Sequence, residues 1–419
     1  MRKPSRDART AALEVIHALR DAGHVALLAG GCVRDMLLKR TPKDYDVVTD
    51  ATPARVHALF PRARKVGAQF GVMLVRRYGH DVEVATFRSE GTYSDGRHPD
   101  EIRFGTEVED AARRDFTING LFYDPVAERV IDHVGGTADI EAGVVRTIGV
   151  PEQRFAEDHL RMLRAVRFAA TLGFAIAPTT MDAIRRHAPK LRAISVERIW
   201  QELEQILTDP SRARGWGLLI EVGLRPHLVS QWEPLTGEDW SVPRRLAALP
   251  DGVISGTLGL AAAVSARGPT QAKKIARTLR LSNREIQEIV WLVASLPQAR
   301  AADTLELADL KLLRSQPGWD DLVALLAADL KAKEADAGPC RELCRRAAAI
   351  APEAVNPPPL LSGHDLAALG LSEGPTVGPI LGHLRRAQLN EEIRDRAEAE
   401  CLARRLIRGV VGGASQSRE

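Results

Sequence analysis

Hydrophobic residues follow two different patterns along the chain. Between Val25 and about Ile148, short apolar runs alternate with Gly, Asp and Pro, which is typical of β-strands joined by turns. Two helical patterns, at Thr10–Ala22 and Pro53–Leu59, precede and interrupt these runs. This mixture predicts an α+β domain. The predicted strands are Val25–Leu28, Tyr45–Val48, Val72–Val75 and Val82–Phe87.

The second pattern begins after Pro151, where strand signals nearly vanish. Helical patterns rich in Ala, Leu and Arg follow, and Pro and Gly separate them, for example at Asp209-Pro210. No clear internal repeat is visible. The consecutive prolines Pro357–Pro359 indicate a semi-rigid joint before a last helical segment. The α+β domain is therefore expected to be followed by all-α parts.

Composition narrows the class of protein only slightly. The chain has 419 residues, enough for two or more domains with cores of their own. The formal net charge is only +3, so a nucleic-acid surface would have to come from local clusters of basic residues. The four cysteines form no dense framework and no secretory signal is visible, which together predict a cytoplasmic protein. No apolar run is long enough to cross a membrane, so no membrane partner is expected.

The first candidate for chemistry is a glycine turn followed by two aspartates. Gly30 and Gly31 lie between a predicted strand and a helix, where backbone N–H groups can bind a phosphate, and Arg34 lies in the first turn of that helix. Asp44 and Asp46 are two residues apart at a predicted strand edge, so their carboxylates should share one face. Mg²⁺ prefers carboxylates, water and substrate phosphates, so the pair predicts a site for nucleotide-bound magnesium. Two solvated surface aspartates are the alternative.

The arrangement Gly-Gly-x-Val-Arg-Asp followed by Asp-Tyr-Asp resembles the signature of class II tRNA nucleotidyltransferases (CCA-adding enzymes) and the related bacterial poly(A) polymerases, within the DNA polymerase β-like nucleotidyltransferase superfamily. The resemblance implies that Asp44 and Asp46 hold catalytic metals while an RNA 3′-hydroxyl attacks the α-phosphate of a nucleoside triphosphate. It implies a polymerase β-like catalytic head followed by an all-α neck that recognises the base, an all-α body, and an all-α tail that binds tRNA. We place these four parts at residues 1–149, 150–215, 216–355 and 356–419.

Glu83 lies between valines on a predicted strand and should point away from the apolar side. By resemblance to the wider superfamily it is a candidate third catalytic carboxylate near the metals. An exposed strand acid without a role is the alternative, and the sequence leaves the choice open.

A second motif runs from Arg113 to Gly120. Two arginines can bind a triphosphate, and Asp115 and Asn119 have groups able to hydrogen-bond a ribose. These two residues share a face if the segment is helical, and an ordinary amphipathic helix is the alternative. The segment resembles the family element Arg-Arg-Asp-Phe-Thr-Ile-Asn-Ala, which implies contacts to ribose and phosphates by Arg113, Arg114, Asp115 and Asn119. Gly120 stands where the family has Ala.

The third motif begins at Glu157 and is predicted to be one helix through Phe168, with a polar row of residues spaced by three. Asp accepts and Arg donates hydrogen bonds, so neighbours in this row can read the polar edge of a base. A salt bridge on a solvated helix is the alternative. The motif resembles the family's Glu-Asp-x-x-Arg, which implies that Asp158 and Arg161 pair with C or A in place of a template and that Glu157 orients Arg161. The nucleotide-binding residues predicted on this helix are Asp158, Arg161, Arg164 and Arg167.

Two further segments resemble the family away from the catalytic motifs. Ser195–Glu202 is similar to a neck motif and is interpreted as a structural brace that Ser195 caps. Near the C-terminus, Leu360–Leu366 and the helix predicted after Gly378 are similar to the family's tail. The arginines of that helix are either a solvated face or contacts to tRNA phosphates. They are Arg385, Arg386, Arg394 and Arg396.

Two segments bear on which member of the family the chain represents. Lys65–Val72 resembles the CCA-adding form rather than the poly(A) polymerase form. Ser89–Asp100 resembles a full-length flexible loop, which disfavours an enzyme that adds only C. The expected function is template-independent addition of CCA to tRNA from CTP and ATP with Mg²⁺. An A-adding enzyme with a separate CC-adding partner and a poly(A) polymerase remain alternatives within the family.

Two rivals come from other classes. A metal-dependent phosphohydrolase would need further ligands around His364-Asp365, and no histidine cluster precedes that pair. A non-catalytic RNA-binding module would not be expected to keep both Asp44 and Asp46. The sequence leaves the oligomeric state open.

Overall fold

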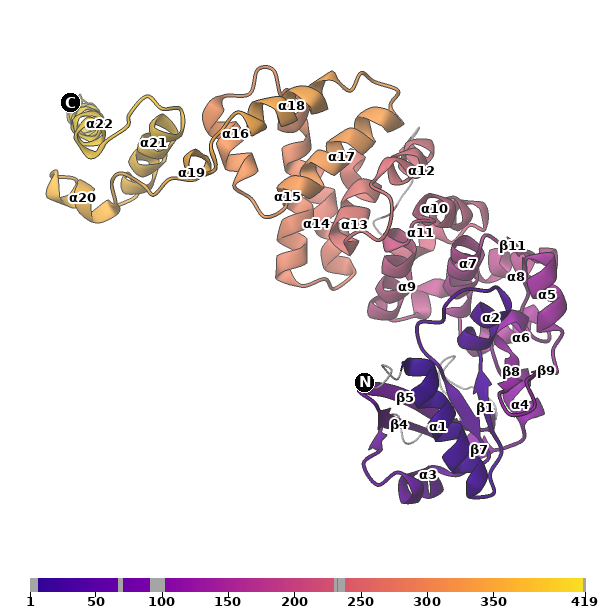
Figure 1. Cartoon of the computed structure of the whole chain (residues 1–419). Coiled ribbons are helices and arrows are strands. Elements are labelled where there is room, and N and C mark those ends of the chain that lie inside the picture. The colour runs from indigo at the N-terminus through magenta and orange to yellow at the C-terminus, as the bar shows by residue number, and fades with distance from the viewer. Residues whose placement is uncertain (1–6, 67–70, 91–101, 230–231, 233–237, 417–419) are drawn as a thin grey trace. The chain divides into compact units, whose positions relative to one another are not determined.

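The computed structural model describes residues 7–66, 71–90, 102–229, 232 and 238–416. The chain forms two compact units. One comprises Met1–Leu235 with Thr278–Arg280, and the other comprises Thr236–Arg277 with Leu281–Glu419 (Figure 1). The finer division into head, neck, body and tail stays a prediction.

The first unit contains a mixed seven-stranded sheet of order β3-β4-β5-β2-β1-β8-β9, which confirms the α+β prediction. Strands β2 and β5 pair in parallel, and the other neighbours in the sheet are antiparallel. The strands are β1 Ala26–Ala29, β2 Val47–Thr49, β3 Arg64–Lys65, β4 Val72–Arg77, β5 His80–Thr86, β8 Leu121–Asp124 and β9 Arg129–Asp132.

Helix α1 (Ala8–Asp21) shows why the sequence forms these layers. Its apolar residues recur at helical spacing, and Ala11, Val15 and Leu19 are fully buried while the opposite face is exposed. Asp7 caps the helix by accepting a hydrogen bond from Thr10 N at 2.8 Å. Strand β1 is buried at all four positions because it lies inside the sheet.

The remaining elements of this unit are short helices and two small ribbons. One ribbon pairs β6 (Arg88–Glu90) with β7 (Ile102–Phe104), and the other pairs β10 (Val144–Val145) with β11 (Ala175–Ile176). The α-helices are α2 Gly31–Leu37, α3 Pro53–Leu59, α4 Glu107–Ala112, α5 Gly136–Ala142, α6 Pro151–Glu157, α7 Arg161–Leu172, α8 Pro178–His187, α9 Val196–Thr208, α10 Arg212–Glu221 and α11 Arg225–Leu228.

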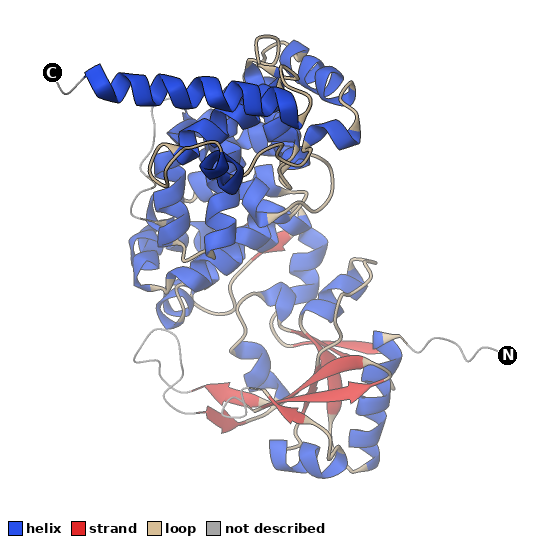
Figure 2. Ribbon diagram, turned by 90° about the vertical axis from the view of Figure 1, so that its left-hand side faces the viewer, coloured by secondary structure: helices blue, strands red, loops and turns tan. Residues whose placement is uncertain are grey.

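The second unit is helical throughout its described part, as predicted (Figure 2). A cluster of buried leucines and isoleucines holds its last helices together. The helices are α12 Glu238–Ala248, α13 Gly256–Val264, α14 Gly268–Thr278, α15 Asn283–Arg300, α16 Leu307–Arg314, α17 Trp319–Ala332, α18 Gly338–Ala348, α19 Pro352–Val355, α20 Gly363–Ala368, α21 Val377–Leu389 and α22 Arg396–Gln416. Helix α14 ends at Thr278, where the chain passes briefly into the first unit.

The predicted basic helix near the C-terminus is two helices, because α21 ends at Leu389 and α22 begins at Arg396. Three of its four arginines, Arg385, Arg386 and Arg396, form side-chain bonds within the chain. Arg386 bonds both oxygens of Asp309 at 2.7 Å, and Arg385 donates to the carbonyl oxygen of Pro357 at 2.6 Å. Their contact with tRNA phosphates stays a prediction.

Asp365 of the predicted His-Asp pair has a local partner. Its carboxylate completes a capping box with Ser362 at the start of α20, and it also forms an ion pair with Arg396. The carboxylate therefore stabilises the helix terminus.

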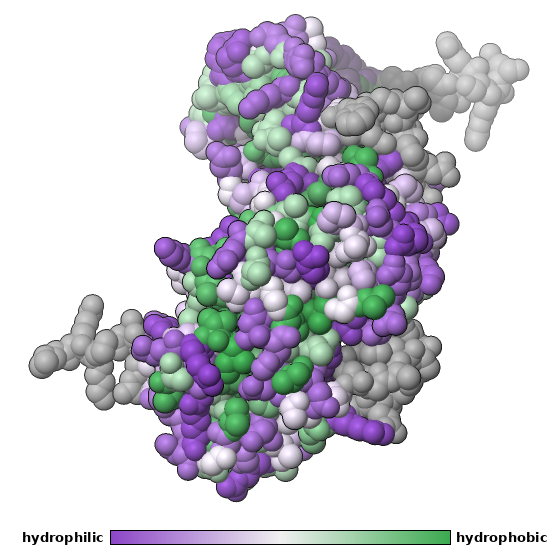
Figure 3. All heavy atoms as spheres, turned by 90° about the vertical axis from the view of Figure 1, so that its right-hand side faces the viewer, coloured by the Kyte–Doolittle hydropathy of each residue, from purple (hydrophilic) through white to green (hydrophobic). Residues whose placement is uncertain are grey.

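No helix in the described residues combines the length and the apolar character that a membrane span requires. Figure 3 shows one face of the molecule, on which hydrophilic residues surround separate groups of hydrophobic ones.

Candidate active site

A cavity of about 740 Å³ in the first unit brings most of the predicted site residues together. All of them except Asp44 and Arg167 line it. They come from four parts of the chain, namely the turn before α2 with α2 itself, the strands β2 and β5 with the residue before β2, the Arg113–Gly120 segment, and the region around α7. The predicted residues on its wall are Gly30, Gly31, Arg34, Asp46, Glu83, Arg113, Arg114, Asp115, Asn119, Asp158, Arg161 and Arg164.

Asp46 and Glu83 are neighbours at the edge of the cavity. Strands β2 and β5 run parallel with Val47 opposite Val84, so the residues one position earlier on each chain stand side by side. Strand β2 begins at Val47, which means that Asp44 and Asp46 precede the strand. The predicted start of this strand at Tyr45 is therefore two residues too early, and the shared face of the two carboxylates stays a prediction. Asp44 is exposed and lies outside the cavity wall.

The electrostatics of Asp46 suit a cation. Burial, together with the charges of Glu83 and Asp44, raises the pKa of Asp46 to about 6, against the opposing charge of Arg114. Negative charge is thus in excess, which a divalent cation would neutralise. In the described part of the chain, no group of three or more His, Cys, Asp or Glu residues is arranged to enclose a metal. A cation here would be held by the carboxylates together with the phosphates of a ligand.

Gly30 forms the turn that precedes α2. Its φ of +72° lies in the left-handed region, where glycine carries no steric penalty. A Cβ at this position would lie 2.8 Å from Nη1 of Arg114. The glycine therefore permits both the turn and the close approach of the arginine.

The Arg113–Gly120 segment is not a regular α-helix. Helix α4 ends at Ala112, and a single 3₁₀ turn follows at Thr117–Asn119. Asn119 nevertheless reaches Asp115, because its Nδ2 donates to Oδ1 of that residue at 3.1 Å. The predicted shared position of the two side chains is present, although the helix on which it rested is not.

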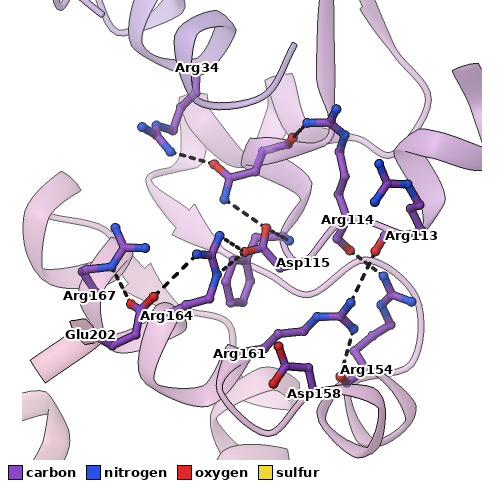
Figure 4. Close-up of polar contacts among 12 residues, drawn as sticks. Arg34, Arg113, Arg114, Asp115, Arg154, Asp158, Arg161, Arg164, Arg167 and Glu202 are labelled. Atoms are coloured by element: carbon purple, nitrogen blue, oxygen red, sulfur yellow. Dashed lines mark hydrogen bonds and ion pairs between the residues drawn. The ribbon is translucent and has the colours of Figure 1, made fainter. Parts of the chain in front are cut away.

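A continuous polar network joins this segment to α7 and α9 (Figure 4). Arg34 Nη1 donates to Asn119 Oδ1 at 2.6 Å, and Arg164 Nε donates to Asp115 Oδ2 at 2.8 Å. The charged environment holds the pKa of Asp115 below its usual value against the effect of burial, Arg164 being the main cause. The Asp115 carboxylate also accepts from Phe116 N, so in this structure its acceptor positions are largely filled.

Glu202 ends this network on α9. It is 6% exposed, and its Oε2 accepts from Arg167 Nε at 2.7 Å. Arg167 is thereby held outside the cavity wall, which departs from its predicted place beside a nucleotide. The predicted brace by the Ser195–Glu202 segment is present in this contact.

Asp158 and Arg161 line the cavity from the junction of two helices. Helix α6 ends at Glu157 and α7 begins at Arg161, so the prediction of one continuous helix is wrong. The physical reason is the extended backbone of Asp158, whose φ is −149° and whose Oδ1 accepts from Leu160 N at 3.0 Å. This side chain-to-backbone bond competes with helix continuation.

The two residues are held by different partners. Oδ2 of Asp158 accepts from Arg198 Nη2 at 2.8 Å. Arg161 donates to the carbonyl oxygen of Arg154 at 3.0 Å and forms an ion pair with Glu157, the contact expected of a residue that orients it. Asp158 and Arg161 thus approach the cavity without a salt bridge between them.

Sequence reasoning missed three contributors to this site. Arg198 lines the cavity, although its segment was interpreted only as a brace. Phe168 forms an apolar wall beneath arginines, with its ring centre 5.3 Å from the guanidinium carbons of Arg34 and Arg164. Asp110 is fully buried behind Arg113 and Arg114. For Asp110, a signal existed in its spacing of three and four residues before the two arginines.

Parts of two predicted segments lie outside the described residues. They are 67–70 within Lys65–Val72 and 91–100 within Ser89–Asp100. Of the second segment only Ser89 and Glu90 are described, and they belong to strand β6, whose first residue Arg88 lines the cavity.

Two family models match the chain. The poly A polymerase head domain matches residues 26–146, and the probable RNA and SrmB-binding site of polymerase A matches residues 173–235. The first range contains the carboxylates and the Arg113–Gly120 segment.

Curated relatives and solved structures agree with these models. The CCA-adding enzyme of Geobacillus stearothermophilus is 35% identical over 394 residues, which cover 92% of this chain and 94% of that protein. The crystal structure of the Bacillus stearothermophilus CCA-adding enzyme in complex with CTP has a TM-score of 0.79 at 31% identity, covering 96% of this chain and 98% of that one. A Thermotoga maritima CCA-adding enzyme complexed with tRNA, at 20% identity and a TM-score of 0.66, shares the fold and covers 97% of each chain. The family consists of nucleotidyltransferases that use divalent metal ions, and by these similarities the chain belongs to the CCA-adding enzyme family.

Proposed function

We propose that this protein adds CCA to the 3′ end of tRNA, using CTP and ATP and no nucleic-acid template. The observation that carries the proposal is the composition of one cavity, which joins the carboxylates Asp46 and Glu83, a set of arginines, and the pair Asp158 and Arg161. These groups supply the needs of nucleotidyl transfer, namely a cation site, phosphate binding and base selection.

The cation is proposed to be Mg²⁺, held by Asp44 and Asp46 together with the triphosphate. The excess negative charge around Asp46 supports this assignment. When bound, the ion would neutralise charge at the α-phosphate. Glu83, beside Asp46, adds to the field that attracts it. Arg113 and Arg114, on the same cavity wall, would bind the phosphates through charge-assisted hydrogen bonds.

Base selection is assigned to Asp158 and Arg161. An acceptor and a donor that are held by separate partners can pair with the polar edges of C and A. Their partners Arg198 and Glu157 hold them in place, so one rigid pair would serve both nucleotides. Binding of the ribose by Asp115 and Asn119 stays a prediction, since both side chains bond each other here.

Replacing Arg161 by Ala is expected to reduce kcat/KM for CTP and ATP by about 10–100-fold relative to UTP and GTP, because a bidentate base contact is worth about 1–3 kcal/mol. Incorporation of all four nucleotides into a tRNA lacking CCA would be measured. Arg185→Ala is the matched control, since Arg185 belongs to an exposed Asp-Arg pair with the same spacing of three on α8. An unchanged nucleotide preference in Arg161→Ala would remove this residue from base selection.

The function itself is tested with three tRNAs, ending before CCA, after C and after CC, each supplied with CTP, ATP or both and Mg²⁺. We expect the shortest tRNA to gain CCA and extension to stop there. Activity on the CC-ended tRNA alone would indicate an A-adding enzyme with a separate partner. Long A tails would indicate a poly(A) polymerase, and no incorporation by folded protein would contradict nucleotidyl transfer.

A further inference from the structure

Asp110 is a buried carboxylate behind the phosphate-facing wall of the cavity. It lies on α4 and is 0% exposed, although no part of it lines the cavity. A carboxylate in such a position destabilises a fold unless cations and hydrogen bonds compensate it. The groups that bind the Asp110 carboxylate therefore indicate its role.

Each oxygen of Asp110 binds a different arginine. Oδ1 accepts from Arg113 at 2.9 Å to Nε and 2.6 Å to Nη2. Oδ2 accepts from Arg114 at 3.1 Å to Nε and 3.0 Å to Nη2. Oδ1 also accepts from the backbone N of Arg88 at 3.3 Å. The Asp110 carboxylate thus accepts two hydrogen bonds from each of the two guanidinium groups and holds them in place. Arg88, Arg113 and Arg114 all line the cavity.

The position of Arg114 is fixed on its other side as well. Its Nη1 donates to the carbonyl oxygen of Asn119 at 3.2 Å, and the same atom lies against the turn at Gly30. Its guanidinium is 5.1 Å from the ring centre of Phe122. Arg114 and Asp46 line the same cavity. Asp110 therefore anchors a guanidinium group that lies beside the glycine turn, in the cavity that Asp46 also lines.

We infer that Asp110 is a positioning residue of the nucleotide site, which sets the guanidinium groups of Arg113 and Arg114 for contact with a triphosphate. The inference rests on the proposed function, because it concerns how that site holds its substrate. Without the carboxylate, both long side chains would regain rotamer freedom and the cavity would lose its fixed phosphate donors. Binding of a triphosphate should then suffer more than binding of a monophosphate.

The test compares the affinities of CTP and CMP by titration calorimetry with Mg²⁺ and without tRNA. In Asp110→Asn we expect the affinity for CTP to fall by about tenfold or more, since both guanidinium groups lose a charged partner that holds them, and the affinity for CMP to change much less. Asp132→Asn is the matched control. Asp132 also accepts several hydrogen bonds in the same unit, from the backbone N atoms of residues 134 to 137, but it does not line the cavity or contact these arginines. It should keep the wild-type ratio of the two affinities.

A double-mutant cycle separates positioning from general destabilisation. If Asp110 acts through Arg113 and Arg114, then adding Asp110→Asn to the variant Arg113→Ala/Arg114→Ala should leave its CTP-to-CMP ratio nearly unchanged. A wild-type ratio in Asp110→Asn, or an equal further loss in the arginine double variant, would overturn the inference.

If Asp110→Asn does not fold, Asp110→Glu tests the inference by the same ratio of CTP affinity to CMP affinity. It keeps the charge but displaces the carboxylate by one methylene, so a smaller loss of CTP preference is expected, and a wild-type ratio would again overturn the inference. A wild-type protein that binds CTP no better than CMP would instead count against the proposed nucleotide site.

Discussion

Asp46→Asn is expected to lower nucleotide incorporation by at least about a thousandfold while making the folded protein more stable. The loss of activity follows from the removal of a carboxylate that would hold the metal, since such an ion supplies several kcal/mol of transition-state stabilisation. The gain in stability follows from the raised pKa of Asp46, about 6 against an ordinary value of 3.8. An acid with a raised pKa destabilises the folded state wherever it is ionised.

The raised pKa of Asp46 also determines the pH range in which Asp46→Asn is more stable than the wild type. The folded state holds the Asp46 proton more tightly than the unfolded state, so its contribution to stability is lost as the pH rises from about 4 to about 6. Asp46→Asn should therefore be more stable than wild type at pH 7, by on the order of 1–3 kcal/mol, and equal to it below pH 4.

Urea unfolding at several pH values and single-turnover incorporation would measure both effects. Asp50→Asn, which lies just past the end of the same strand and does not line the cavity, should keep wild-type incorporation. A fully active Asp46→Asn would contradict the catalytic assignment.

Asp329→Ala is expected to destabilise the second unit by about 3–5 kcal/mol, because it leaves a buried arginine without its counter-charge. Asp329 and Arg245 have side chains that are each 1% exposed, and their Oδ1 and Nε atoms are 3.1 Å apart. Arg245 also donates to the carbonyl oxygen of Ala262 at 3.0 Å. Because Arg245 is buried, its guanidinium could not reach water to replace the lost carboxylate. Lys333 and Arg300 pair with the other oxygen of Asp329.

Thermal and denaturant unfolding of the full chain, followed by probes in the second unit, would show this loss. The matched control is Asp336→Ala in the same unit, where an exposed ion pair with Arg341 should contribute less than about 1 kcal/mol. Equal effects of the two substitutions would mean that the buried pair is not the source of stability that its burial indicates.

The sequence predicted those elements whose pattern is local. Helix α3 spans the predicted Pro53–Leu59, because Thr52 caps it, Pro53 suits its first turn, and Phe60 leaves helical geometry. Strand β4 begins at the predicted Val72 and continues two residues beyond the predicted end. Apolar alternation and turn residues determine such elements without knowledge of distant partners.

The errors occur where one side chain forms a bond that periodicity does not contain. The break at Asp158 arises because its carboxylate bonds Leu160 N and then Arg198, which lies 40 residues away. Arg167 repeats the spacing of the base-reading row, yet Glu202 on another helix holds it outside the cavity wall. The geometry of Asp110 also depends on folding, although its spacing to the arginines could have drawn attention to it.

The proposal that one cavity binds both CTP and ATP is tested most directly by equilibrium competition between labelled ATP and CTP on the wild-type protein with Mg²⁺. We expect CTP to displace ATP completely, and Arg161→Ala to weaken the binding of both. Simultaneous binding of the two nucleotides, or an Arg161→Ala variant that binds both as wild type does, would contradict one shared site lined by Asp158 and Arg161.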